Sequence, residues 1–217
     1  MALKGTLIWI CSLAVLSFSA AQDETLPQIC SSQTQLFERL SADLKVAAQC
    51  NKSLSSALDA QQSSELLLSM RSLTDCLHKH QLKECQGAKP NECPEAEVPT
   101  NGGLACVTVD DKRYCKPVCN HGYDFGFIRR SRLFDECSKQ TKYKWDTQYV
   151  GGNKLAVCSE ASDQIAGAKS AYFPRDQDCL VTKSSSQLQN STIEGFITEL
   201  RNQGILGEPQ YACLVCG

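Results

Sequence analysis

The chain has 217 residues, a formal net charge of −2 at pH 7 and 14 cysteines. A nearly neutral chain lacks the strongly basic surface of a dedicated nucleic-acid-binding protein, so we expect no nucleic acid among its partners. Cysteine at this density is typical of proteins that fold in an oxidising compartment, because disulfides persist there and not in the cytosol.

Residues 1–21 are typical of a secretory signal peptide. Lys4 supplies a positive charge, an apolar run follows, and small residues at Ala20 and Ala21 mark the cleavage site. The alternative is a membrane anchor, but the run is about a dozen residues long and an anchor needs ~20. We therefore expect a secreted, extracellular protein without membrane insertion.

Residues 22–90 are predicted to be helical. Apolar residues recur three and four positions apart over 37–58 and again over 66–80. The polar residues 61–64 between the two stripes can begin a new helix. This pattern predicts an antiparallel helical hairpin, and one long helix in a homo-oligomeric coiled coil is the alternative.

Four cysteines in this segment suggest two nested bridges. Cys50 and Cys76 lie about 12 and 13 residues from the break, a rise of about 19 Å in either helix, so they can face each other. Cys30 and Cys85 would then close the open end. Four cysteines allow three connectivities, so this pairing is a hypothesis. Asn51 begins Asn-Lys-Ser, an acceptor sequence for N-glycosylation.

Residues 91–158 are predicted to be a small β module with six cysteines. The sequence from Cys106 to Cys115 predicts a β-hairpin around the turn Asp110-Asp111-Lys112. A bridge between the two cysteines would fix the register of the hairpin. A module of ~65 residues buries little apolar surface, so covalent bridges must replace part of its core.

The cysteine pattern of this segment resembles the sushi, or complement control protein, family. The resemblance is carried by Cys93-Pro94, Pro99-Thr100-Asn101-Gly102, Tyr-Cys-x-x-x-Cys-x-x-Gly-Tyr at 114–123, and then Cys137, Trp145 and Cys158. The family is a small antiparallel β domain, which implies the bridges Cys93–Cys137 and Cys119–Cys158 with Trp145 in the core. The extra pair Cys106/Cys115 and the long insert at 125–133 depart from the family pattern.

Within this module, six basic residues lie in a stretch of 16 positions that also contains Asp135 and Glu136. Such a cluster attracts polyanions, including sulfated polysaccharides, and an ordinary solvated loop is the alternative. The six residues are Arg129, Arg130, Arg132, Lys139, Lys142 and Lys144.

Residues 159–217 are expected to form an extension with one helix. Thr192 can cap a helix that runs over 193–203. Asn190 begins a second glycosylation sequence, Asn-Ser-Thr. A bridge between Cys179 and Cys213 would hold this helix in place.

Cys216 is then the odd cysteine, because loss of Cys11 with the leader leaves 13. An intermolecular Cys216–Cys216 bridge would give a disulfide-linked homodimer. Cys213 and Cys216 also form a Cys-x-x-Cys pair of the thiol–disulfide oxidoreductase type. Such pairs act at a helix N-terminus, and no helix can follow this one, so redox catalysis ranks low.

These segments predict an α+β fold: a disulfide-linked helical hairpin, a sushi-like β module and a C-terminal segment with one helix. The three histidines, His78, His80 and His121, form no recognisable metal motif, and no phosphate loop or nucleophile motif is present. We expect a secreted, glycosylated, non-enzymatic protein without cofactors, which binds an extracellular protein or glycan or contributes to matrix. A diffusible ligand or modulator of a cell-surface receptor is the alternative.

The whole chain is also similar to small secreted, development-specific proteins of echinoderms. The segment 115–158 and the ending Cys-Leu-Val-Cys-Gly carry this resemblance. It implies a developmental role without specifying a molecular mechanism.

Overall fold

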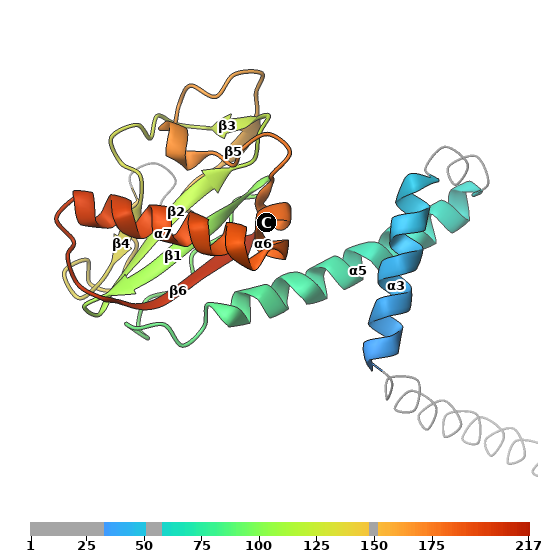
Figure 1. Cartoon of the computed structure of the whole chain (residues 1–217), viewed down its shortest axis with the longest axis horizontal. Coiled ribbons are helices and arrows are strands. Elements are labelled where there is room, and N and C mark those ends of the chain that lie inside the picture. The colour runs from blue at the N-terminus through green and yellow to red at the C-terminus, as the bar shows by residue number, and fades with distance from the viewer. Residues whose placement is uncertain (1–32, 51–57, 148–151) are drawn as a thin grey trace, which may run out of the picture. The chain divides into compact units, whose positions relative to one another are not determined.

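The computed structural model describes residues 33–50, 58–147 and 152–217 (Figure 1). The chain divides into two compact units, residues 1–69 and residues 70–217. Helix α3 (Gln33–Gln49) lies in the first unit, and helix α5 (Ala60–Glu84) begins there and continues into the second. No helix within the described ranges is long and apolar enough to span a membrane. The expected signal peptide, Cys30 and Asn51 lie outside the described residues.

Helix α5 begins earlier than the sequence suggested, so the polar residues 61–64 lie inside it. Its cap is Asp59, whose Oδ1 accepts a hydrogen bond from the Gln62 N–H at 2.8 Å. Gln62 Oε1 accepts one from the Asp59 N–H at 3.2 Å in return. This reciprocal pair is a capping box, and it places the break before residue 60. The expected hairpin between the two helices stays a prediction.

The earlier break changes the positions of the two cysteines expected to pair. Cys50 directly follows α3, whereas Cys76 lies 16 residues into α5, a rise of about 24 Å along that helix. Their distances from the break are therefore unequal. Both are free and exposed thiols, and the expected Cys50–Cys76 bridge is not formed.

The second unit contains a four-stranded antiparallel sheet with strand order β4-β2-β1-β6 (Figure 1). Its strands are β1 (Gly102–Val109), β2 (Lys112–Cys119), β4 (Asp135–Cys137) and β6 (Pro209–Cys216). A smaller sheet pairs β3 (Tyr123–Phe125) with β5 (Cys158–Glu160). The mixture of helices and antiparallel sheet fits the expected α+β class.

Strands β1 and β2 form the predicted hairpin, with Cys106 directly opposite Cys115. Asp110 and Asp111 connect the strands, and both have positive φ angles, 49° and 56°. A two-residue loop of this kind matches the right-handed twist of the strands it joins, and aspartate tolerates its left-handed backbone.

The C-terminal segment belongs to the main sheet and is not an extension of it. Strand β6 pairs antiparallel with β1 from Gly103 opposite Cys216 to Thr108 opposite Tyr211. The expected single helix is in fact two, α6 (Cys179–Ser184) and α7 (Ser186–Asn202), after a 3-10 turn η1 (Lys169–Ala171). Ser185 caps α7, so Thr192 lies inside the helix and not at its start.

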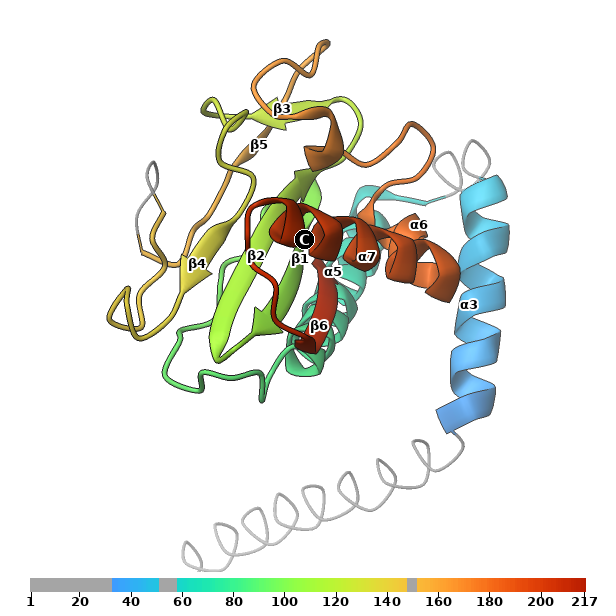
Figure 2. The ribbon, with the colours of Figure 1, turned by 60° about the vertical axis from the view of Figure 1, so that its left-hand side comes forward.

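Both faces of the main sheet are covered. Helix α7 lies across one face (Figures 1 and 2), where its Phe196 and Leu200 pack against Val107 and Leu214. The segment 85–98 and Trp145 cover the other face. Because side chains alternate along a strand, every residue of the central strand β1 is buried.

Five disulfides cross-link the second unit. Cys93–Cys137, Cys106–Cys115 and Cys119–Cys158 are the pairs expected from the sequence. The remaining two are Cys85–Cys213 and Cys179–Cys216, so the expected pairs Cys30–Cys85 and Cys179–Cys213 are wrong.

The alternation of side chains along β6 explains why Cys85 and Cys179 have other disulfide partners than expected. Cys213 and Cys216 are three residues apart, so their side chains point to opposite faces of the sheet. Cys213 lies on the face covered by the segment 85–98 and meets Cys85, while Cys216 lies on the helical face and meets Cys179 at the start of α6. A Cβ at Gly103 would overlap the Sγ of Cys179, so glycine is required where that bridge crosses β1.

A buried carboxylate joins strand β3 to the loop before η1. Asp124 Oδ2 accepts hydrogen bonds from the N–H groups of Ile165 and Ala166, both at 2.9 Å, and Oδ1 accepts from the Tyr172 hydroxyl. Burial of Asp124 opposes ionisation, but these hydrogen bonds outweigh it and lower the pKa of the carboxyl group. Burial, together with the hydrogen bond to Asp124, raises the pKa of Tyr172 to about 12.

Candidate functional site

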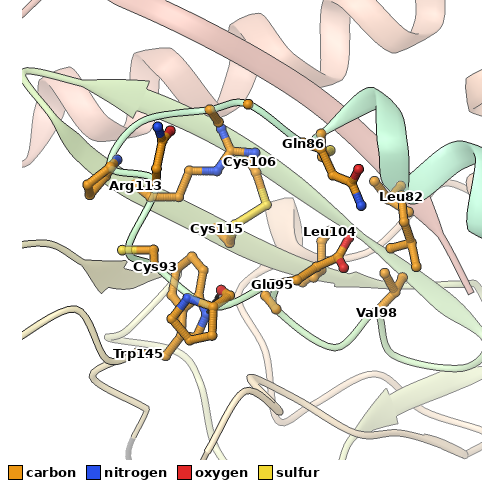
Figure 3. A pocket seen from close by; sticks show the side chains of 18 residues that line it. Leu82, Gln86, Cys93, Glu95, Val98, Leu104, Cys106, Arg113, Cys115 and Trp145 are labelled. Atoms are coloured by element: carbon orange, nitrogen blue, oxygen red, sulfur yellow. Dashed lines mark hydrogen bonds between the residues drawn. A yellow bond between two sulfur atoms is a disulfide. The ribbon is translucent and has the colours of Figure 1, made fainter.

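A cavity of about 380 Å³ lies between the main sheet and the segment 85–98. It is on the face of the sheet that carries Cys106, Cys115 and Cys213, called here the cysteine-bearing face. This size is near the lower end of the range for small-molecule sites, about 300–1,000 Å³. Figure 3 shows Arg113 and Trp145 toward one side of the cavity and Leu82 and Val98 toward the other, with Leu104 between them. The wall therefore combines apolar side chains with a single buried cation, and the exposed residues Gln86, Asn91 and Glu95 add polar groups.

The floor of the cavity is fixed by cysteines from neighbouring strands. Cys106 lies opposite Cys115 on β2 and also opposite Cys213 on β6. Cys106 is bonded to Cys115, and Cys213 to Cys85 at the end of α5. Cys93 is bonded to Cys137 on β4, which holds the covering segment to the sheet. Three covalent links thus preform this part of the molecule.

Trp145 is buried at the side of the cavity, as the sushi resemblance implies for its core tryptophan. Its indole Nε1 donates a hydrogen bond to the Pro94 carbonyl oxygen at 2.9 Å. The ring is thus held in one orientation and presents apolar surface to the cavity.

Arg113 reaches the cavity because it lies two residues before Cys115 on β2, and alternate residues of a strand share a face. Its side chain is only 6% exposed. Nη1 donates to Thr108 Oγ1 and Nη2 to Cys213 Sγ, each at 3.1 Å. The Tyr211 ring lies 6.0 Å from the guanidinium carbon.

Burial lowers the pKa of Arg113 to about 10, and the nearby Tyr211 opposes this change. The side chain therefore still carries its positive charge at pH 7. No aspartate or glutamate of the described residues lies within ion-pair distance of it. A cation buried without a counter-ion is costly, which marks Arg113 as a candidate functional residue.

Arg113 is not among the sites predicted from the sequence, and neither is this cavity. The sequence does contain one indication of it: Arg113 is a charged residue two positions before Cys115, so the two share a face of the predicted strand. What could not be anticipated was the covering segment, since its attachment depends on the bridge from Cys85 to Cys213.

The structure separates the six basic residues that were expected to form one patch. Arg129 is buried, with its Nη2 2.8 Å from Asp135 Oδ2, and Arg132 contacts the other oxygen of the same carboxylate at 3.1 Å. Arg130 is exposed and donates from Nε to the Ile165 carbonyl oxygen. The residues left exposed on the turn after β4 are Lys139, Lys142 and Lys144.

The other predicted sites are also placed. Asn190 lies on α7 and is exposed. Cys216, expected to be free, is bonded to Cys179 and 2% exposed, so it cannot form an intermolecular Cys216–Cys216 bridge in this fold. Cys213 and Cys216 are bonded to different cysteines and form no Cys-x-x-Cys disulfide.

Within the described ranges, no three His, Cys, Asp or Glu side chains are grouped as a metal site would require. Compared with known proteins, the chain matches no protein-family model, no curated protein and no solved structure.

Proposed function

We propose that the protein is secreted and glycosylated and acts outside the cell by binding a partner, without catalysis. Five disulfides in a unit of 148 residues, 70–217, are compatible with an oxidising extracellular environment. The leader sequence at residues 1–21 and the acceptor sequences at Asn51 and Asn190 support the same location.

The observation that carries a binding role is the cavity at the cysteine-bearing face of the sheet. It is preformed by covalent links, apolar side chains make up much of its wall, and Arg113 is a buried charged group in it. Concave apolar sites with a few fixed polar groups are the usual form of small-molecule sites. We propose that this cavity is the site at which a ligand, or an inserted group of a larger partner, is bound.

The proposal is tested with the full chain secreted from a eukaryotic cell. A ligand should be found by the rise in melting temperature that it causes when added in excess. The variant Leu82→Trp places a large side chain at the cavity wall and should abolish that rise. Leu77→Trp, at an exposed position on the same helix, is the matched control and should retain it. A stabilising ligand that acts equally on both variants would contradict the assignment of the site.

The cellular location and the glycosylation of the protein are tested in the same eukaryotic expression experiment. The protein should appear in the medium, and a glycosidase that removes N-linked glycans should lower its mass. Asn51→Gln and Asn190→Gln should each remove one step of that change. Retention inside the cell, or a mass unaffected by the enzyme, would contradict this part of the proposal.

The sushi-like identity of residues 91–158 is part of the proposal. The bridges Cys93–Cys137 and Cys119–Cys158 follow the first-to-third and second-to-fourth order, and the buried Trp145 occupies the core. Strand β6 and helix α7 complete the same sheet from outside that segment. The proposed family likeness therefore concerns the disulfide core, and a developmental role rests on the resemblance of the whole chain alone.

A receptor ligand or modulator is the second candidate function. It is favoured by apolar side chains left exposed on the part of α5 in the second unit, namely Met70, Leu73 and Leu77. These residues recur at helical spacing and would suit an apolar groove on a receptor. Replacing all three with glutamine should abolish cell binding if this function holds and should leave ligand binding at the cavity unchanged.

A further inference from the structure

Strand β2 carries a buried cation on each of its two faces, and the two cations have different hydrogen-bond partners. Lys116 faces helix α7, where its Nζ lies 2.6 Å from Glu199 Oε2. Arg113 faces the cavity, and its hydrogen-bond acceptors are a neutral hydroxyl and a disulfide sulfur. Lys116 is thus paired with a carboxylate, whereas no carboxylate of the described residues lies within ion-pair distance of Arg113.

The guanidinium also keeps donors for a further partner. Arginine has five N–H donors, and two hydrogen bonds to protein acceptors are present at Arg113. A carboxylate suits the remaining capacity, because its two oxygens match the fork of the guanidinium and the bonds are charge-assisted. Entry of such a group into the cavity would supply the missing counter-charge.

We propose that the cavity binds a small organic anion, with a carboxylate on Arg113 and an apolar alkyl or aryl body beside Leu82, Val98, Leu104 and Trp145. This inference rests on the proposed binding function and specifies the ligand class of the same site. Figure 3 shows Leu82 and Val98 together at the side of the cavity away from Arg113, which leaves the apolar walls for the body of the ligand.

Glu95 limits the ligand to a single anionic group. It lines the same cavity but is exposed, whereas Arg113 is buried. A second negative charge on the ligand would meet the Glu95 carboxylate near the solvent. A monocarboxylate is therefore favoured over a dicarboxylate.

The test compares octanoate with octanamide, its neutral amide of nearly equal shape, by titration calorimetry on the full secreted chain. A charge-assisted hydrogen bond should make octanoate bind at least about tenfold more tightly. Equal affinities would overturn the anion inference and leave the proposed binding function standing. Binding of neither compound would also overturn the inference, whereas the proposed function would still be decided by the comparison of Leu82→Trp with Leu77→Trp.

Variants of Arg113 separate recognition from structural support. Arg113→Gln should remove the preference for octanoate and leave octanamide binding within about twofold, because the apolar walls are unchanged. Arg113→Lys should restore part of the preference through its charge. Lys112→Gln, which removes a positive charge from the same strand outside the cavity lining, is the matched control and should leave both affinities within about twofold. Loss of both ligands in a folded Arg113→Gln protein would show a purely structural role and overturn the inference.

Discussion

Cys85 and Cys213 are bonded although 128 residues separate them in the sequence, and their Cα atoms lie 5.7 Å apart. The bridge fastens the end of helix α5 to the last strand of the sheet. Around it, His78 Nδ1 lies 3.0 Å from the Cys216 carbonyl oxygen, and Gln81 Oε1 accepts a hydrogen bond from the Cys216 N–H. Helix α5 thereby satisfies backbone groups on the outer edge of β6, which an edge strand otherwise exposes.

Residues 91–158 alone are therefore expected not to fold. They lack β6, which pairs along β1, and α7, which covers one face of the sheet. Residues 70–217 should show a cooperative thermal transition by circular dichroism, because they keep both sheets and all five bridges. A cooperative transition of the fragment 91–158, with a melting temperature near that of residues 70–217, would contradict the architecture.

The contribution of α7 to the core can be measured through Phe196. This side chain is 1% exposed, and its ring centroid lies 5.8 Å from that of Phe134. Phe196→Ala should lower the free energy of unfolding by about 3–5 kcal/mol, because it removes buried apolar surface and leaves a cavity. Glu194→Ala, at an exposed position on α7, should change it by less than about 0.5 kcal/mol. Denaturant unfolding of both variants gives the comparison, and similar values would show that α7 does not cover the core.

The local elements were largely predictable because their signals lie within short stretches of sequence. The hairpin between Cys106 and Cys115 follows from two β-type runs and a turn. The helical spacing predicted over 37–58 agrees with α3 as far as Gln49, and that predicted over 66–80 agrees with α5. The start of α5 differs from the prediction because Asp59 and Gln62 form a capping box ahead of the polar residues 61–64.

The long-range pairings were not predictable, because periodicity does not say which distant segment a strand joins. The prediction contains no strand at Pro209–Cys216, so it does not place Cys213 and Cys216 on opposite faces of a sheet. Without this strand, the prediction pairs Cys85 and Cys179 with the wrong cysteines. It also lacks the bridge that attaches the segment covering the cavity. Arg113 could be recognised as a buried cation only after this face was known to be covered.

The carboxylate of Asp124 should make stability depend on acid. Its pKa is lowered in the folded state from 3.8, so its ionised form stabilises the fold at pH values above about 4. This stabilisation is lost as the pH falls from the unfolded pKa through the lower folded one. Asp124→Asn should cost about 2–3 kcal/mol at pH 7, because its NH2 group would face the N–H donors of Ile165 and Ala166.

The measurement is denaturant unfolding at pH values between 2 and 7 for both proteins, a range that spans the titration of an aspartate. The difference in unfolding free energy between wild type and Asp124→Asn should shrink toward low pH. A difference that stays constant over the whole range would contradict a stabilising ionised carboxylate at this position.

Binding of polyanions should depend on the exposed lysines of the turn after β4 and not on the buried Arg129. The triple substitution of Lys139, Lys142 and Lys144 with glutamine should make the protein elute from immobilised heparin at lower salt, because it removes the solvent-facing charges of the turn. The same change at the exposed residues Lys79, Lys83 and Lys89 removes equal charge and serves as control. Equal elution of the two triple variants would leave net charge, and not this turn, as the cause of retention.

The pairing of Cys85 with Cys213 is tested most directly by mass spectrometry of peptides released without reduction from the expressed protein, with cleavage after Leu214 to separate Cys213 from Cys216. The account predicts one linked species that contains Cys85 and Cys213 and another that contains Cys179 and Cys216. Peptides that join Cys30 to Cys85 and Cys179 to Cys213 would contradict it, because the last strand would then be free of helix α5 and the cavity would lose its covering segment.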